Sequence, residues 1–151
     1  MTHYLDRRGF TLIELLISIA VIATLTAIAI GVYVNVTERA KVAKAIADLR
    51  IMDGEIAAFE GDTGRLPNDL AEIHHASLRD PWGNAYEYLP FATGNMGARR
   101  KDHALVPLNS TYDLYSKGKD GTSQPALTSS ASGDDIVRAN DGGFFGRAST
   151  Y

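Results

Sequence analysis

Three acidic side chains near the carboxyl end of the chain have the chemistry of a calcium site. Asp120 lies in a Lys-Gly-Lys-Asp-Gly run, and Asp134 and Asp135 follow a loop rich in serine, glycine and alanine. Calcium takes about six to eight oxygen ligands from carboxylates, backbone carbonyls and water. The three carboxylates could surround such an ion if the loop doubles back, and a loop with so little apolar content needs a cross-link of this kind. No EF-hand pattern is present, so the residues alone leave open whether these acids bind calcium or are solvated.

A second residue with unusual chemistry is Glu14, the only charged residue between Phe10 and Val34. A carboxylate inside a membrane span costs on the order of 2–3 kcal/mol and is a candidate functional group. At a helix start the same carboxylate is stabilised by the helix dipole, and the two interpretations are compatible. A cut between Gly9 and Phe10 would expose a positive amino group on Phe10. If a neighbouring subunit were cut in this way, its amino group would be the natural partner of Glu14.

The composition excludes several other chemistries. The chain has 151 residues, 15 Lys+Arg against 18 Asp+Glu, and no cysteine, which rules out disulfide scaffolds and thiol nucleophiles and argues against binding to nucleic acid. His74 and His75 are adjacent and would point about 100° apart on a helix, so they do not form a zinc site. No Ser/His/Asp trio, paired-carboxylate pocket or Walker loop can be singled out. We therefore do not expect an enzyme, even one anchored by its amino-terminal helix.

The element that must position Glu14 is a long apolar helix. Residues 10–34 contain no proline, and at 1.5 Å per residue such a helix is roughly 37 Å long, more than the hydrocarbon core of about 30 Å. The sequence predicts a membrane-spanning helix over 10–34. Basic residues flank this span on both sides, so charge counting does not fix its orientation.

Residues 35–60 continue the helix with an amphipathic pattern. We expect Gly61, Gly64 and Pro67 to end it at Glu60. Apolar residues at steps of three and four predict one buried stripe against a soluble head: Val42, Ala45, Ile46, Leu49, Met52, Ile56 and Phe59.

The remainder of the region 35–151 predicts a small folded head. Asp69 and Glu72 have capping-box spacing, which indicates a short helix over 69–76. Alternating residues predict strands near Tyr86 and over 112–116. Trp82, the only tryptophan, is expected to anchor the head core.

The loop 92–110 is rich in glycine and basic residues. Leu105 and Val106 are a brief strand candidate, whereas Arg99, Arg100 and Lys101 are interpreted as solvated. The whole pattern predicts an α+β fold, in which a long amino-terminal helix packs on a small antiparallel sheet that carries a carboxyl-terminal metal-binding loop.

The stretch Arg-Arg-Gly-Phe-Thr-Leu-Ile-Glu-Leu-Leu at 7–16 resembles the class III signal of type IV pilins and pseudopilins. In that family a prepilin peptidase cuts after the glycine and methylates the new phenylalanine amine, and the glutamate guides subunit docking into a filament. By motif match these roles fall on Gly9, Phe10 and Glu14, so residues 1–9 are expected to be a leader. Many members carry a proline near the middle of this helix, where this chain has Gly31.

Further blocks, in the same order, resemble the major pseudopilin of type II secretion systems. The resemblance implies calcium in the carboxyl-terminal loop, held by Asp120, Asp134 and Asp135 with the backbone carbonyl of Lys117. Because the loop is longer than usual, Asp141 is a possible substitute for the second acid. The blocks are Phe59 to Pro67, Asp80 to Tyr88, Tyr112 to Gly121 and Asp134 to Ile136.

The same resemblance implies a function. The chain would be a structural subunit of a periplasmic pseudopilus that drives export of folded proteins across the outer membrane. Expected partners are further copies of itself in a helical filament, minor pseudopilins, the prepilin peptidase and the inner-membrane assembly platform. Before assembly it would cross the bacterial inner membrane once, with its head in the periplasm. The alternative is a type IV pilin of a surface filament, for adhesion, motility or DNA uptake; the absence of cysteine weighs against it.

Overall fold

The computed structural model describes residues 9–151. The expected leader falls almost entirely outside these residues, since positions 1–8 are not described. The chain divides into two compact units within its long helix: the first ends at Glu38 and the second comprises Arg39–Tyr151. The apolar amino-terminal sequence belongs to the first unit, and the folded head belongs to the second.

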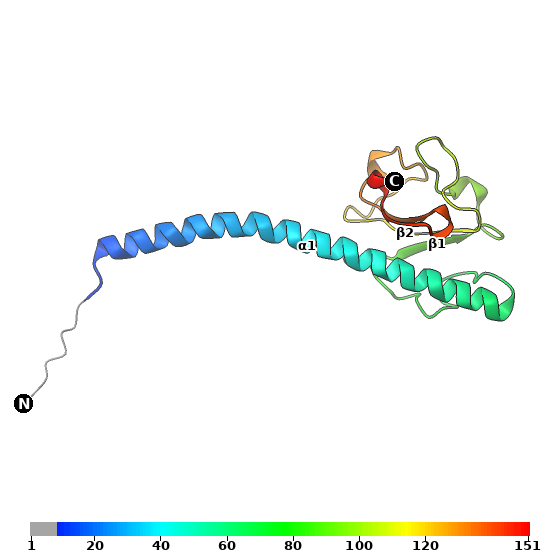
Figure 1. Cartoon of the computed structure of the whole chain (residues 1–151), viewed down its shortest axis with the longest axis horizontal. Helices are drawn as coiled ribbons and strands as arrows, with labels where there is room; N and C mark the ends of the chain where they lie inside the picture. The colour runs from blue at the N-terminus through cyan, green and yellow to red at the C-terminus, as the bar shows by residue number, and fades with distance from the viewer. Residues whose placement is uncertain (1–8) are drawn as a thin grey trace, which may run out of the picture. The chain divides into compact units, whose positions relative to one another are not determined.

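Helix α1 runs from Leu12 to Thr63, a single helix of 52 residues (Figure 1). It begins with a capping box. The Glu14 N–H donates to Thr11 Oγ1 at 3.3 Å, and the Thr11 N–H donates to the Glu14 carboxylate at 2.8 Å. This exchange satisfies two backbone donors that a helix start otherwise leaves free.

The end of α1 lies beyond the predicted position. Gly61 remains helical, and Gly64 is the first residue to take a left-handed conformation, with φ of 72°. Its N–H donates to the Glu60 carbonyl at 2.8 Å, which caps the last turn. The helix therefore continues past Glu60 to Thr63.

The aliphatic side chains of the first unit face outward all around the helix. From Leu12 to Val36, every large apolar side chain is more than half exposed. By length and composition, α1 can cross a membrane, which agrees with the span predicted over 10–34. Nothing within the described chain covers this surface.

The head contains a four-stranded antiparallel sheet whose strands follow chain order, β1-β2-β3-β4. The first two strands confirm the prediction from alternating residues, while the hairpin of β3 and β4 was not predicted. The strands are β1 (Tyr86–Pro90), β2 (Tyr112–Ser116), β3 (Ile136–Ala139) and β4 (Phe144–Arg147). Short 3-10 helices are η1 (Met96–Ala98), η2 (Ser130–Ser132), η3 (Asn140–Gly142) and η4 (Ala148–Thr150).

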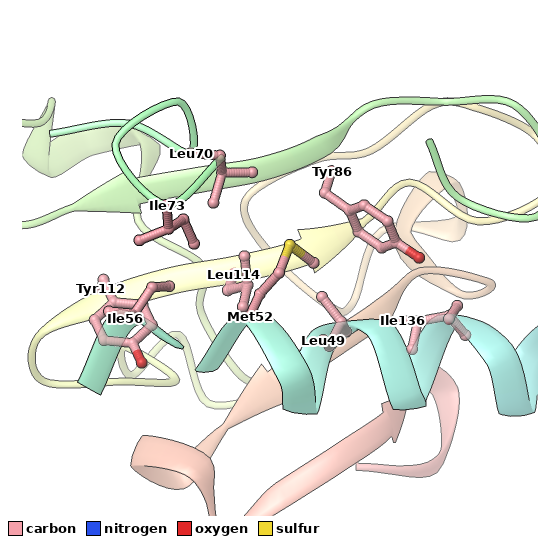
Figure 2. Packing of buried hydrophobic residues seen from close by; sticks show 10 residues of the cluster. Leu49, Met52, Ile56, Leu70, Ile73, Tyr86, Tyr112, Leu114 and Ile136 are labelled. Carbon is pink, nitrogen blue, oxygen red and sulfur yellow. The ribbon is translucent and has the colours of Figure 1, made fainter. Parts of the chain in front are cut away.

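The carboxyl half of α1 packs against this sheet and forms the main core. Figure 2 shows α1 side chains meeting residues of the strands and of the connection before β1. Trp82 is half-buried and packs against the same core, as predicted. The predicted stripe is confirmed: Ala45, Leu49, Met52 and Ile56 are fully buried, and Val42, Ile46 and Phe59 are partly buried beside them.

Two tyrosine hydroxyls add polar links between the sheet and α1. Tyr86 donates to Asp48 at 2.8 Å, and Tyr112 donates to Asp53 at 2.6 Å. Burial, together with these carboxylates, raises the pKa of both tyrosines above the ordinary value. Each ring therefore contributes apolar area to the core while its hydroxyl keeps a partner.

The segment predicted as a helix over 69–76 is a series of hydrogen-bonded turns instead. Asp69 does accept from the N–H groups of Ala71 and Glu72, as a cap would. However, His74 takes a left-handed φ of 63°, which stops helical propagation after one turn. His75 contacts the carboxylate of Glu55 and is half-buried, whereas His74 is exposed.

Leu105 and Val106 do not form the predicted strand. Leu105 has φ of 61°, outside the extended region. The carboxylate of Asp102 accepts from the N–H groups of Ala104 and Val106, both at 2.8 Å. This side chain therefore holds the segment in a turn and competes with strand pairing.

Candidate functional site

The first candidate site is the amino-terminal start of α1. Gly9 and Phe10 precede the helix, and Phe10 is 88% exposed. Glu14 lies in the first helical turn and accepts from the N–H of Thr11 at 2.8 Å and from its hydroxyl at 2.7 Å. Glu14 therefore lies at a helix start, and the contacts with Thr11 add a cap that was not predicted; cleavage at Gly9 and subunit docking by Glu14 stay predictions.

The geometry leaves Glu14 able to take a second partner. Both hydrogen bonds from Thr11 end on the same atom, Oε2. A carboxylate offers about four acceptor positions over its two oxygens. The Oε1 atom is therefore available to a cationic donor without loss of the cap.

The second candidate site is the loop between β2 and β3, residues 117–135, which carries the three predicted acidic ligands and Lys117. The Asp134 carboxylate accepts from the N–H groups of Lys119 and Asp120, at 2.8 and 3.0 Å. Asp120 in turn accepts from the Thr122 N–H at 2.8 Å. A Cβ at Gly118 would lie 2.4 Å from the Asp134 carbonyl oxygen, so glycine permits this close approach. The loop therefore does double back, which was the condition for its two ends to meet.

Asp135 belongs to a different set of contacts. Its side chain is fully buried, and Oδ2 accepts from Arg100 Nη2 at 2.5 Å and from the Ser123 hydroxyl at 2.6 Å. Burial raises the pKa of the Asp135 carboxyl above its ordinary value, although Ser123 and the Arg100 charge oppose that rise. Arg100, predicted to be solvated, is only 2% exposed.

Of the remaining predicted ligands, Lys117 was proposed through its backbone carbonyl, and that role stays a prediction. The contact of this residue in the structure is between its ammonium and Glu87 at 2.5 Å. Asp141 accepts from the N–H and the hydroxyl of Ser110, both at 2.8 Å, in the turn between β3 and β4. Asp141 is therefore committed to Ser110 and is not a member of the β2–β3 loop.

Taken together, the donor set does not fit the calcium site that the resemblance implies. Among residues 9–151, no three histidine, cysteine or acidic side chains gather in a way that could hold a metal ion. With Asp135 facing a guanidinium, Asp120 and Asp134 are the two predicted carboxylates left, so a calcium ion there would depend mainly on backbone carbonyls and water for its about six to eight oxygens. Calcium binding stays a prediction, which these side-chain contacts do not favour.

The aspartate of the Asp-Pro-Trp-Gly-Asn turn holds this loop to the sheet. Asp80 accepts from the N–H of Trp82 at 3.0 Å, from that of Asn84 at 2.8 Å and from the Ser116 hydroxyl at 2.5 Å. Asn84 donates its side-chain amide to the Gly118 carbonyl at 2.8 Å. Two of the sequence blocks that carry the resemblance thus contact each other at the start of the β2–β3 loop.

The sequence interpretation missed Arg100 and Arg138. Both guanidinium groups lie over tyrosine rings of β2, at 4.3 and 4.0 Å from the ring centroids. Arg138 contacts the Asp53 carboxylate of α1 and donates to Asn109 at 3.1 Å. The residues next to an arginine in the sequence do not show whether its side chain is buried or solvated, so no local signal could have identified these two.

Comparisons with known proteins agree with this architecture. The family described as "Prokaryotic N-terminal methylation motif" matches residues 5–30. The type II secretion system core protein G of Xanthomonas campestris pv. campestris is 26% identical over 128 residues, which cover 75% of this chain and 79% of that protein. Its counterpart in Pseudomonas aeruginosa is 25% identical over 137 residues, which cover 77% of this chain and 86% of that protein.

A type IV pilin is also similar. The type IV major pilin protein PilA of Myxococcus xanthus is 35% identical over 101 residues, which cover 66% of this chain and 44% of the pilin. No solved structure matches significantly.

The methylation motif, the long amino-terminal helix and the four-stranded antiparallel sheet define a pilin-like protein of α+β fold. Within that class, the chain is a relative of the major pseudopilin of type II secretion systems, the core protein G.

Proposed function

We propose that this chain is the structural subunit of a type II secretion pseudopilus. The observation that carries the proposal is the apolar surface of α1 from Leu12 to Val36, which is exposed all around the helix. A surface of this kind needs lipid around it in the single subunit, and it can exchange lipid for neighbouring helices in a filament. The relatives named as type II secretion core proteins support the same role.

The start of α1 fits the maturation that a pilin-like subunit undergoes. Gly9 and Phe10 lie before the first helical turn and are exposed, so a prepilin peptidase can reach the bond between them without unwinding α1. Cleavage would place a positive amino group on Phe10, and methylation would retain that charge. In the filament, this group would bind the Oε1 atom of a neighbour's Glu14.

The proposed location follows from the same two units. The apolar part of α1 would cross the bacterial inner membrane once, with the head in the periplasm. Partners would be further copies of the chain, minor pseudopilins, the prepilin peptidase and an inner-membrane assembly platform. Energy for assembly would come from a separate ATPase, because the sequence contains no Walker loop.

The second candidate function is a type IV pilin of a surface filament. One observation favours it: the pilin of Myxococcus xanthus has the higher identity of the relatives described above, over a shorter aligned region. The core proteins G align over a larger share of both partners, which favours secretion.

A deletion of the gene in its own host tests the proposal. We expect exoproteins to accumulate in the periplasm, surface filaments to persist, and the restored protein to begin at an N-methylated Phe10 by mass spectrometry. Normal secretion together with lost surface filaments would favour the pilin alternative. A restored protein that keeps Met1 would contradict the maturation step alone.

A further inference from the structure

A buried guanidinium, that of Arg100 in the loop 92–110, lies against the β2–β3 loop. The geometry points to Arg100 as the resident cation of this loop: its guanidinium neutralises Asp135 and joins the loop to the sheet without a metal ion. This inference goes beyond the proposed function, because it concerns how the head keeps the β2–β3 loop ordered.

The contacts of Arg100 reach the loop at separated points. Nη2 donates to Asp135 at 2.5 Å, next to the end of the loop. Nη1 donates to the Gln124 carbonyl at 3.0 Å and contacts the Ser123 hydroxyl. The loop is also closed internally there, since Ser132 exchanges hydrogen bonds with the backbone of Gln124 at 2.9 and 3.0 Å. One side chain thus ties together segments that the sequence separates.

Arg100 is itself fixed to the sheet and to its own loop. Its backbone N–H donates to the Asp113 carboxylate of β2 at 2.6 Å, and its guanidinium lies over the Tyr115 ring. The next residue, Lys101, donates to the Pro125 carbonyl at 2.8 Å and accepts from the Leu127 N–H at 2.9 Å. Arg100 and Lys101 therefore connect the loop 92–110 to the β2–β3 loop, whereas much of the rest of that loop is exposed.

The charge balance explains why an arginine is needed at this position. Asp135 is fully buried, and a buried carboxylate without a cationic partner is strongly destabilising. Asp135 Oδ1 and Arg100 Nε are buried without hydrogen-bond partners in the described chain, and they are the complementary acceptor and donor of a bidentate arginine–carboxylate pair. A divalent cation at the same carboxylate would repel the guanidinium, so the arginine disfavours a metal ion at Asp135.

The test is thermal unfolding of the full chain in detergent micelles, followed by Trp82 fluorescence, in chelator, in calcium and in magnesium. Arg100→Met should lower the Tm by about 10 °C or more, because it leaves Asp135 buried without its partner. The matched control is Arg99→Met, a neighbouring arginine whose guanidinium lies 4.0 Å from the Phe91 ring centroid. Loss of that contact should lower the Tm by about 2–4 °C at most.

A second comparison keeps the inference testable if Arg100→Met does not fold. The double variant Arg100→Met/Asp135→Asn removes both charges, and it should melt above Arg100→Met, because no uncompensated charge stays buried. Wild-type Tm should be the same in chelator, calcium and magnesium. Three results would overturn the inference: equal Tm values for Arg100→Met and Arg99→Met, a double variant that is no more stable than Arg100→Met, or a wild-type Tm that calcium raises and chelator lowers.

Discussion

The two halves of α1 meet opposite surroundings although they belong to one helix. In the first half, Leu25 is 62% exposed, as are its apolar neighbours to a similar degree. In the second half, Leu49 and Met52 are completely buried against the sheet. The helical backbone is common to both, so the difference comes from the distribution of side chains around the axis.

This difference separates two kinds of stability. An apolar surface on all sides of a helix has no partner in the single subunit. Its burial can therefore stabilise only membrane insertion or filament assembly, and not the fold of the subunit. An apolar stripe with a polar reverse face is satisfied within the subunit. Substitutions in the first half of α1 should therefore change assembly, and substitutions in the second half should change folding of the head.

The largest expected effect is on assembly. Glu14→Leu should reduce filament yield more than tenfold while membrane insertion and head melting stay unchanged, because the carboxylate gains its cationic partner only in the polymer. The control is Thr26→Leu, which removes a hydroxyl that bonds only to the Ile22 carbonyl of its own helix. Filament counts by electron microscopy measure the effect, and wild-type yield from Glu14→Leu would exclude the docking role.

A pair of leucine truncations tests the comparison directly. Leu49→Ala should lower the free energy of unfolding of the head by about 2–5 kcal/mol, because it opens a cavity in the packed core. Leu25→Ala makes the same chemical change in the first half and should leave head unfolding unaltered. Denaturant titration in micelles, followed by Trp82 fluorescence, compares the two. Equal losses would mean that the first half of α1 contributes to head stability.

The smallest expected effect concerns pH and an exposed ion pair of the head. Hydrogen bonds from Arg65 and Asn68 lower the pKa of Glu72 from 4.5 to about 2. Because this pKa is depressed by folding, the contribution of Glu72 is present above about pH 4.5 and is lost as pH falls toward 2. Glu72→Gln should flatten the decline of Tm across that interval, compared with Glu60→Gln. If Tm falls equally with acid in Glu72→Gln and in the wild type, the ion pair of Arg65 and Glu72 contributes nothing measurable to stability.

The elements that the sequence predicts well are those with a long or strictly alternating pattern. The span over 10–34 and the stripe from Val42 to Phe59 are unambiguous because each repeats over several helical turns. The strand over 112–116 was found from the alternation of large residues. The β3–β4 hairpin was missed because each strand has four residues, although Asn-Asp-Gly-Gly between two apolar pairs is a typical hairpin signal.

The candidate site was predicted less completely, for a physical reason. Glu14 could be singled out because it is the only charge in a long apolar run, whereas its contacts with Thr11 were not predicted. The partner of Asp135 is Arg100, which comes from a loop on the other side of β2, and this pairing depends on how two long loops pack. Residue types alone identified the three acids, but they did not identify Arg100 as the partner of Asp135.

The order of the strands has a consequence for how the head folds. Each strand of the sheet pairs with the one that follows it along the chain, so sheet formation requires only local chain closures. The distant contacts are those between α1 and the strands, such as Asp53 with Arg138. Local pairings form quickly, and contacts between distant segments carry the larger loop-closure entropy. We therefore expect docking of the sheet onto α1 to set the folding rate, and a helix formed beforehand would give the strands a surface on which to assemble.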